Sequence, residues 1–161
     1  LAFAGGMASA QQLSLGQISD YLNNLQTAQA EFTQINADGT ISTGTIYIKR
    51  PGRIRFEYNA PDNSLVLAGG GALAVFDARS NTGPDQYPLG QTPTITAREP
   101  DHPEYGNIQL VFTDQPTELR QWIITDNTGS QTTVILGDLT KGMSLSENLF
   151  SVAVAQRDWK P

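Results

Sequence analysis

Residues 44–61, GTIYIKRPGRIRFEYNAP, decide the fold of this chain. Before Pro51, Ile46 and Ile48 stand two residues apart, and after it Ile54 and Phe56 keep the same spacing. Alternation with a period of two predicts two β-strands whose side chains point to opposite faces of a sheet. Pro51 cannot donate to a sheet ladder and favours an extended conformation at Arg50, so a hairpin corner is predicted there. Arg50 is thereby placed at the rim of an apolar sheet face.

The composition limits the class of protein. A chain of 161 residues and 17.4 kDa is long enough for one domain with a sizeable core. The formal net charge is -6, the pI is about 4.6, and there is no basic run, so we expect no nucleic-acid partner. There is no cysteine, which excludes disulfides, thiolate chemistry and zinc–thiolate sites. No run of about 20 apolar residues is present to span a membrane.

Residues 1–10, LAFAGGMASA, resemble the end of a secretory signal or form a flexible arm of small residues. The small-x-small triplet at residues 8–10 is typical of a signal cleavage site. We therefore expect residues 11–161 to form a single domain that works outside the cytoplasm.

The rest of the pattern predicts one helix followed by many strands. Apolar residues at spacings of three and four predict an amphipathic helix over residues 14–25, with Ser14 as its N-cap. A short helical turn is predicted at 144–149. Strands are predicted at residues 27–33, 40–49, 53–59, 64–68, 72–78, 94–97, 107–113, 119–125, 131–139 and 150–155. This order predicts an α+β fold in which a strongly curved antiparallel sheet, or incomplete barrel, wraps over the helix.

Catalytic and metal sites find little support. His102 is the single histidine, and without a cysteine the usual nucleophile–base pairs are nearly unavailable. No second cluster of ligands stands at metal spacing, so His102 is interpreted as a surface residue. Residues 69–71 are three glycines, but they lack the lysine and hydroxyl residue of a phosphate loop and predict a hairpin turn. We expect no enzyme, no metal and no cofactor.

Several predicted strands are apolar on both faces. Trp122 and Ile124 alternate with Ile123, which is also apolar, and Ile135 lies between Val134 and a leucine. One short helix cannot cover both faces of so many strands. The surplus indicates a second covered surface, a partner, or a cavity for an apolar ligand, and the sequence leaves these three open.

The segment 44–61 resembles the LolA family, the periplasmic carriers of outer-membrane lipoproteins, chiefly in its glycine, its K-R-P corner and its flanking strands. Similar pattern occurs in TAQAEFTQ (27–34), NSLVLAGGGALAVFD (63–77), QYPLGQTP (86–93) and ELRQWIITDNTGSQTTVIL (118–136). The resemblance implies an unclosed β half-barrel covered by an N-terminal helix and short lid helices, with an apolar cavity for acyl chains. It also implies a monomeric chaperone in the periplasm that receives lipoproteins from an inner-membrane ABC transporter and passes them to an outer-membrane receptor. The absence of cysteine favours the soluble carrier over the anchored receptor of the same fold.

The resemblance also implies roles for individual residues. Arg50 matches the arginine that bonds to the lid backbone and favours the closed, empty state, and Ile54 and Phe56 match positions that line the cavity. We expect the acyl-chain cavity to be lined by a subset of Tyr47, Ile54, Phe56, Leu65, Leu67, Val75, Leu110, Phe112, Trp122 and Ile124.

The chain departs from the family pattern after Pro93, where roughly two dozen residues of lid helix and strand are missing before Thr94. Either part of the lid has been lost, or the printed sequence lacks a stretch of the whole protein. An alternative function is a lipid-binding or sensor module of the same fold with a different ligand.

Overall fold

The structure is a computed structural model that describes residues 14–69, 72–77, 85–88, 106–113 and 116–160. Its elements are α1 (Leu15–Asn24), β1 (Thr27–Ile35), β2 (Ile41–Lys49), β3 (Arg53–Tyr58), β4 (Leu65–Gly69), β5 (Ala72–Phe76), β6 (Asp85–Pro88), β7 (Asn107–Thr113), β8 (Glu118–Thr125), β9 (Gln131–Leu136), β10 (Thr140–Lys141), the 3-10 helix η2 (Glu147–Phe150) and α2 (Val152–Asp158). The strands form one antiparallel sheet in the order β6-β5-β4-β3-β2-β1-β9-β8-β7, and β10 extends β9 alongside β1.

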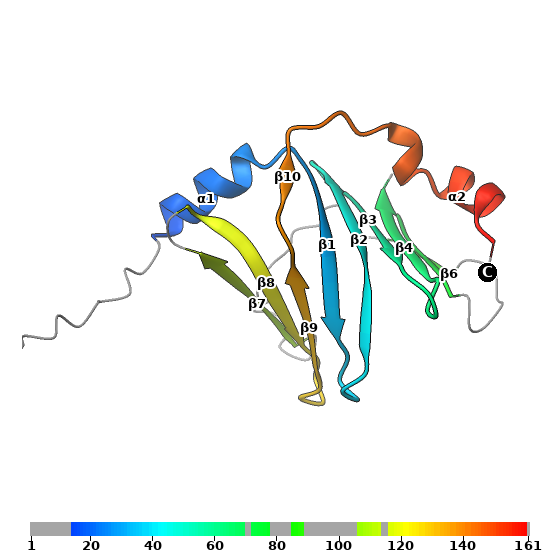
Figure 1. Cartoon of the computed structure of the whole chain (residues 1–161), viewed down its shortest axis with the longest axis horizontal. Helices are drawn as coiled ribbons and strands as arrows, with labels where there is room; N and C mark the ends of the chain where they lie inside the picture. Colours follow the sequence, from blue (N-terminus) through cyan, green and yellow to red (C-terminus); the bar gives the residue numbers. More distant parts are fainter. Residues whose placement is uncertain (1–13, 70–71, 78–84, 89–105, 114–115, 161) are drawn as a thin grey trace, which may run out of the picture.

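The sheet is strongly curved and unclosed (Figure 1). β3 and β8 are four strand spacings apart in the sheet order, which is about 19 Å in a flat sheet. The rings of Phe56 on β3 and Trp122 on β8 nevertheless lie 6.2 Å apart, centroid to centroid. The sheet therefore curls until its two halves touch through their side chains. The predicted α+β half-barrel is confirmed.

The first helix forms as its sequence predicts. The Ser14 hydroxyl accepts a hydrogen bond from the Gln17 N–H, and the Gln17 side chain accepts one from the Ser14 N–H. This reciprocal pair satisfies two N–H groups that the first turn of a helix leaves without partners. The helix ends at the Leu25 cap, whose N–H donates to the Tyr21 carbonyl.

The hairpin corner predicted at Pro51 joins β2 to β3. Lys49 pairs with Arg53, and the pairing continues strand to strand up to Gly44 opposite Tyr58. Gly52 has a φ of 71°, a left-handed conformation that glycine adopts without a steric penalty.

Gly44 has a packing role. A Cβ built on it would lie 2.8 Å from a ring carbon of Phe32 and would clash with the Glu57 carbonyl. The absence of a side chain at this position lets the β1 ring pack against the backbone of β2.

The end of the chain differs from the prediction. A strand was expected at residues 150–155, but α2 forms there, with the Ser151 hydroxyl accepting from the Val154 N–H. Val152, Ala155 and Trp159 all pack against the sheet, and their spacing of three and four residues is helical. The prediction was wrong because the apolar residues at 150, 152 and 154 also fit a period of two.

Two short strands, β6 and β10, were not predicted. β6 lies in a segment rich in proline, and β10 is two residues long. The predicted strand at 94–97, the lid helices, His102 and residues 1–10 lie outside the described residues. Among the described residues, no helix is long and apolar enough to cross a membrane.

Candidate functional site

The concave face of the sheet carries an apolar row that runs across its strands. In the central row, Ile46 on β2 lies opposite Phe56 on β3, which lies opposite Val66 on β4, followed by Val75 on β5. Directly opposed residues share a face of a pleated sheet. The strand pairing therefore gathers these side chains on one surface.

An aromatic cluster fills the middle of this face. Phe32 contacts Phe56 and Tyr58 edge to face, with ring centroids 5.4 Å and 5.1 Å apart, and Phe56 contacts Trp122 in the same way. Phe32 and Trp122 are buried, whereas Phe56 and Tyr58 are half-buried. The concave side is thus packed where its two halves meet. Toward β4 and β5 the same face continues as half-exposed apolar side chains, including Val66 and Val75.

Helix α1 covers one end of the concave face (Figure 1). The Tyr21 ring packs edge to face on Phe112 of β7 at 5.7 Å, which places the helix over the apolar cluster. Lys141 of β10 lies over the same Tyr21 ring, 5.7 Å from its centroid. α1 is therefore held at this end by an aromatic contact on one side and a cation on the other.

Arg50 ties the sheet to the C-terminal end of α1. Its guanidinium donates to the Leu22 carbonyl, and its backbone N–H donates to the Gln26 carbonyl at 2.8 Å. The last carbonyls of a helix have no partner within the helix and carry partial negative charge. α1 has no basic residue in its own last turn, so Arg50 supplies the cation from the β2–β3 corner.

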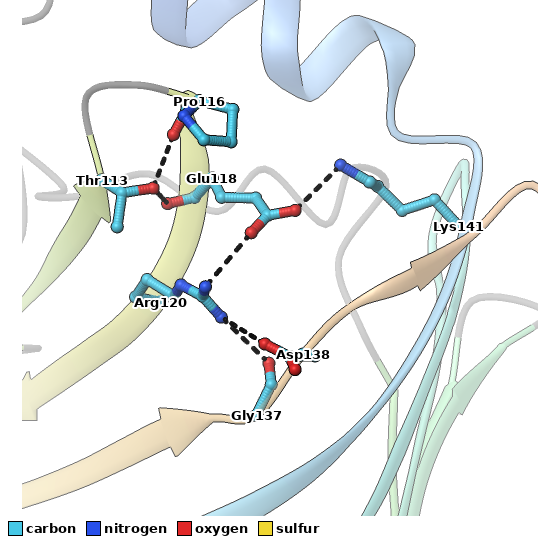
Figure 2. Close-up of polar contacts among 7 residues, drawn as sticks. All are labelled: Thr113, Pro116, Glu118, Arg120, Gly137, Asp138 and Lys141. Atoms are coloured by element: carbon cyan, nitrogen blue, oxygen red, sulfur yellow. Dashed lines mark hydrogen bonds and ion pairs between the residues drawn. The ribbon is translucent and has the colours of Figure 1, made fainter.

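A polar network borders the same end of the sheet (Figure 2). Glu118 accepts ion pairs from Lys141 at 3.1 Å and from Arg120 at 3.4 Å, and Arg120 reaches Asp138 and the Gly137 carbonyl. These contacts join β8 to the interruption between β9 and β10. Because Lys141 also contacts Tyr21, the network helps to position α1.

The structure divides the predicted cavity residues between the two faces of the sheet. Seven lie on the concave face by pairing, alternation or packing: Ile54, Phe56, Val75, Leu110, Phe112, Trp122 and Ile124. Tyr47, Leu65 and Leu67 lie on the opposite face. Leu65 and Leu67 belong to a separate cluster under α2, so they cannot line the same surface as Phe56. The predicted lining is a subset of these ten residues and stays a prediction, and the seven residues on the concave face are its candidates.

The reasons for the division are geometric. The hairpin pairs Ile46 with Phe56, so the alternation already places Tyr47 on the other face from Phe56. For Leu65 the face depends on the connection after β3, and a shift of one residue reverses every side chain of a strand. That shift cannot be read from the sequence.

Sequence reasoning also missed Phe32, Ile46 and Tyr58, which form the centre of the concave cluster. The signal for Ile46 was present, because the hairpin corner sets it opposite Phe56. Phe32 and Tyr58 meet across Gly44, which only the strand pairing reveals.

Burial affects one ionisable group on this face. Burial, and to a smaller extent the nearby Asp62, raises the pKa of the Tyr58 hydroxyl above its ordinary value, although a hydrogen bond with Gln34 opposes the shift. Tyr58 is therefore neutral at ordinary pH. No group of three or more His, Asp or Glu side chains in the described ranges could hold a metal ion.

Comparison with known proteins shows which proteins this chain resembles. A family model described as outer membrane lipoprotein carrier protein LolA matches residues 23–100. The outer-membrane lipoprotein carrier protein of Coxiella burnetii (strain RSA 493 / Nine Mile phase I) is 37% identical over 95 residues, which are 56% of this chain and 44% of that protein. The protein of the same name from Methylococcus capsulatus (strain Bath) is 28% identical over 78 residues, 45% of this chain and 38% of that protein. The resemblance to the LolA family is confirmed.

The LolA match covers the part of the chain that holds Arg50 and strands β1 to β6. The chain spans less than half the length of these curated relatives. A crystal structure of an uncharacterized conserved protein from Thermus thermophilus superposes with a TM-score of 0.54 at 9% identity, over 83% of this chain and 91% of that chain. That likeness shows the fold alone.

Proposed function

We propose that this chain is a periplasmic, non-enzymatic lipoprotein carrier that binds acyl chains on the concave face of its half-barrel. The observation that carries the proposal is the continuous apolar face, from Trp122 through Phe56 to Val75, in a chain whose relatives are named lipoprotein carriers. In the proposed cycle it takes lipoproteins from an inner-membrane ABC transporter and delivers them to an outer-membrane receptor as a monomer. The proposed carrier domain comprises residues 11–161.

The energetics of the cargo support an apolar binding surface. Each buried methylene is worth about 0.8 kcal/mol, so exposing one long acyl chain to water costs on the order of 10 kcal/mol. A half-exposed apolar face next to a packed aromatic cluster can supply that burial if the cluster opens. The packed arrangement around Phe56 then corresponds to the empty state, in which the carrier covers its own apolar face.

Arg50 is proposed as the latch of that empty state. Its hydrogen bonds to the Leu22 and Gln26 carbonyls hold α1 over the concave face. Any contact of Arg50 with a lid after Pro93 falls outside the described residues. A latch that stabilises the empty state lowers the affinity for cargo by the same free energy, which favours delivery to a receptor.

The test uses two isoleucines of similar exposure on opposite faces. Ile124 is 44% exposed on the concave face, and Ile135 is 39% exposed on the other face. Purified protein should release lipoproteins from spheroplasts. Ile124→Asp should reduce release severalfold, because a charge on the binding face must be desolvated by the acyl chain. Ile135→Asp should leave release unchanged.

Two results would contradict the proposal: the unmodified protein releases no lipoprotein from spheroplasts, or Ile124→Asp and Ile135→Asp lose this release equally. Lipid extraction and mass spectrometry of the purified protein provide the check on cargo. Recovery of a ligand other than acylated protein, together with no release, would instead support a sensor module of the same fold.

A further inference from the structure

A second apolar cluster lies on the face of the sheet opposite the aromatic cluster. Leu65 and Leu67 of β4 and Phe76 of β5 pack there against α2. The rings of Phe76 and Trp159 are 5.5 Å apart. Figure 1 shows α2 beyond β4 and β6, at the end of the sheet away from α1. Whatever binds here does not share the proposed carrier surface.

A pocket of about 500 Å³ lies between η2, α2 and strands β3 and β4. Its wall includes Leu65, Leu149, Ala155 and Trp159, and it is partly open to solvent. Small-molecule sites typically measure about 300–1,000 Å³ and are lined mainly by apolar groups. This pocket has the size and the lining of such a site.

Two cations border the pocket. Arg55 donates to the Leu149 carbonyl at 2.9 Å and pairs with Glu57 at 2.6 Å, so its charge is already engaged. Lys160 also lines the pocket, and within the described part of the chain it has no hydrogen bond or ion pair. Asp158, the acidic lining residue, is held by Arg157 through two contacts of 2.6 and 2.8 Å. Among the described charged side chains that line the pocket, the lysine is therefore the one without an ion-pair partner.

The surroundings are basic for so acidic a chain. Five of the ten lysines and arginines are found around η2, α2 and the outer face of β2 and β3: Lys49, Arg53, Arg55, Arg157 and Lys160. The described carboxylates on this side number four, those of Glu31, Glu57, Glu147 and Asp158. The chain as a whole has a formal net charge of -6. This side of the molecule thus favours an anion over a cation.

We propose that the pocket between α2 and β4 binds a single-chain anionic amphiphile, such as a medium-chain fatty acid. The hydrocarbon chain packs against Leu65, Leu149 and Trp159, and the carboxylate lies at Lys160. The site is separate from the carrier surface and would bind its ligand whether or not lipoproteins are the cargo of the concave face.

The two tryptophans of the chain report on the two faces separately. Trp122 lies in the concave aromatic cluster and Trp159 lies in the pocket. In Trp122→Phe the fluorescence comes from the pocket, and in Trp159→Phe it comes from the concave face. The probe is ω-bromoundecanoate, whose bromine quenches a tryptophan only at short range. We expect saturable quenching of Trp159 in Trp122→Phe.

Matched variants on α2 test whether the pocket itself is responsible. Val154 lines the pocket and Ala153 is exposed beside it. In the Trp122→Phe background, Val154→Phe should abolish saturable quenching by filling the pocket, and Ala153→Phe should leave it unchanged. Lys160→Gln should weaken the apparent affinity about two- to fivefold, the range for a partly exposed ion pair. The neutral analogue ω-bromoundecanol should show the same weakening on the unmodified lysine.

The outcomes separate this inference from the carrier proposal. Quenching of Trp122 without quenching of Trp159 overturns the pocket and leaves the carrier surface intact. Equal or non-saturable quenching of Trp159 in Val154→Phe and Ala153→Phe also overturns it, because the contact is then collisional. If Trp122→Phe does not fold, the two indole N–H signals of the unmodified protein, assigned with Trp159→Phe, are followed by NMR during titration with decanoate. A shift confined to the Trp122 signal overturns the proposal.

Discussion

Replacing Arg50 by leucine removes the contact that ties α1 to the sheet while keeping an apolar stem at the corner. The guanidinium bond to the Leu22 carbonyl is lost, and the backbone bond from residue 50 to Gln26 remains. The change should therefore loosen the end of α1 without unfolding the β2–β3 hairpin.

The size of the effect follows from the kind of bond. A hydrogen bond with a charged donor contributes about 1.5–3 kcal/mol when it is buried. Arg50 is half-buried, so solvent screening reduces this to about 1–2 kcal/mol. Since about 1.4 kcal/mol is a factor of ten, local opening of α1 should become about five- to thirtyfold more frequent.

Hydrogen exchange measures that opening directly. Amides in the last turn of α1, from Leu22 to Leu25, should exchange about five- to thirtyfold faster in Arg50→Leu, and amides in β1 and β2 should not change. If the empty state is the latched one, affinity for acyl cargo should rise by the same factor and transfer to the receptor should weaken.

Arg53→Leu is the matched control. Arg53 is at the other end of the same hairpin corner, and its guanidinium pairs with Glu147 on the face opposite α1. The Arg53→Leu variant should leave amide hydrogen exchange in α1 unchanged. Equal exchange of α1 in Arg50→Leu and the unmodified protein would refute the latch, as would the same acceleration in Arg53→Leu.

Three further predictions concern stability. Gly44→Ala should cost about 1–3 kcal/mol of stability through clashes with the Glu57 carbonyl and the Phe32 ring, seen as a lower thermal midpoint, and an unchanged midpoint would contradict the packing at this site. Hydrogen bonds from Lys49 and, second, from Arg53 lower the pKa of Glu147. The contribution of Glu147 to folding stability is therefore present above the ordinary carboxyl pKa of 4.5 and is lost as the pH falls through the lowered pKa. Protection of α2 amides should fall with acid in the unmodified protein, and this pH dependence should be absent in Glu147→Gln. Burial raises the pKa of Tyr58, so the contribution of its hydroxyl to folding stability is present below pH 10.0 and is lost as the pH rises through the raised pKa. A base titration of stability should show this loss in the unmodified protein and not in Tyr58→Phe.

The hairpin at Pro51 was predictable because local features determine it. Strict alternation, a proline that cannot donate and a following glycine all favour the same corner, and β2, β3 and their connection form as expected. The residue type of Ser14 likewise predicted the N-cap of α1, and the structure adds the Gln17 side chain that completes a capping box. Half of the candidate site follows from this hairpin, since it fixes Arg50 at the rim and Phe56 on the apolar face.

The remaining errors have a common cause, which is that the decisive contacts are distant in sequence. Residues 152–155 read as valine and alanine in alternation. The helix forms because Ser151 caps it and because the apolar residues of β4 and β5, such as Leu65 and Phe76, accept its apolar side. The face of Leu65 depends in turn on how the connection after β3 sets the register. The helix at residues 152–155 and the face of Leu65 therefore could not be predicted independently of each other.

These corrections change what the surplus of apolar residues means. The sequence left open a second covered surface, a partner or a cavity, and α2 now provides the covered surface for Leu65, Leu67 and Phe76. That part of the surplus no longer supports the acyl-chain cavity of the concave face. Leu65 and Leu67 drop out of the carrier argument, and the half-exposed Val66 and Val75 beside the aromatic cluster remain. Because these two lie where the half-barrel is open and no described helix covers them, acyl chains should contact β4 and β5 first, and variants there should affect loading more than variants in the packed centre.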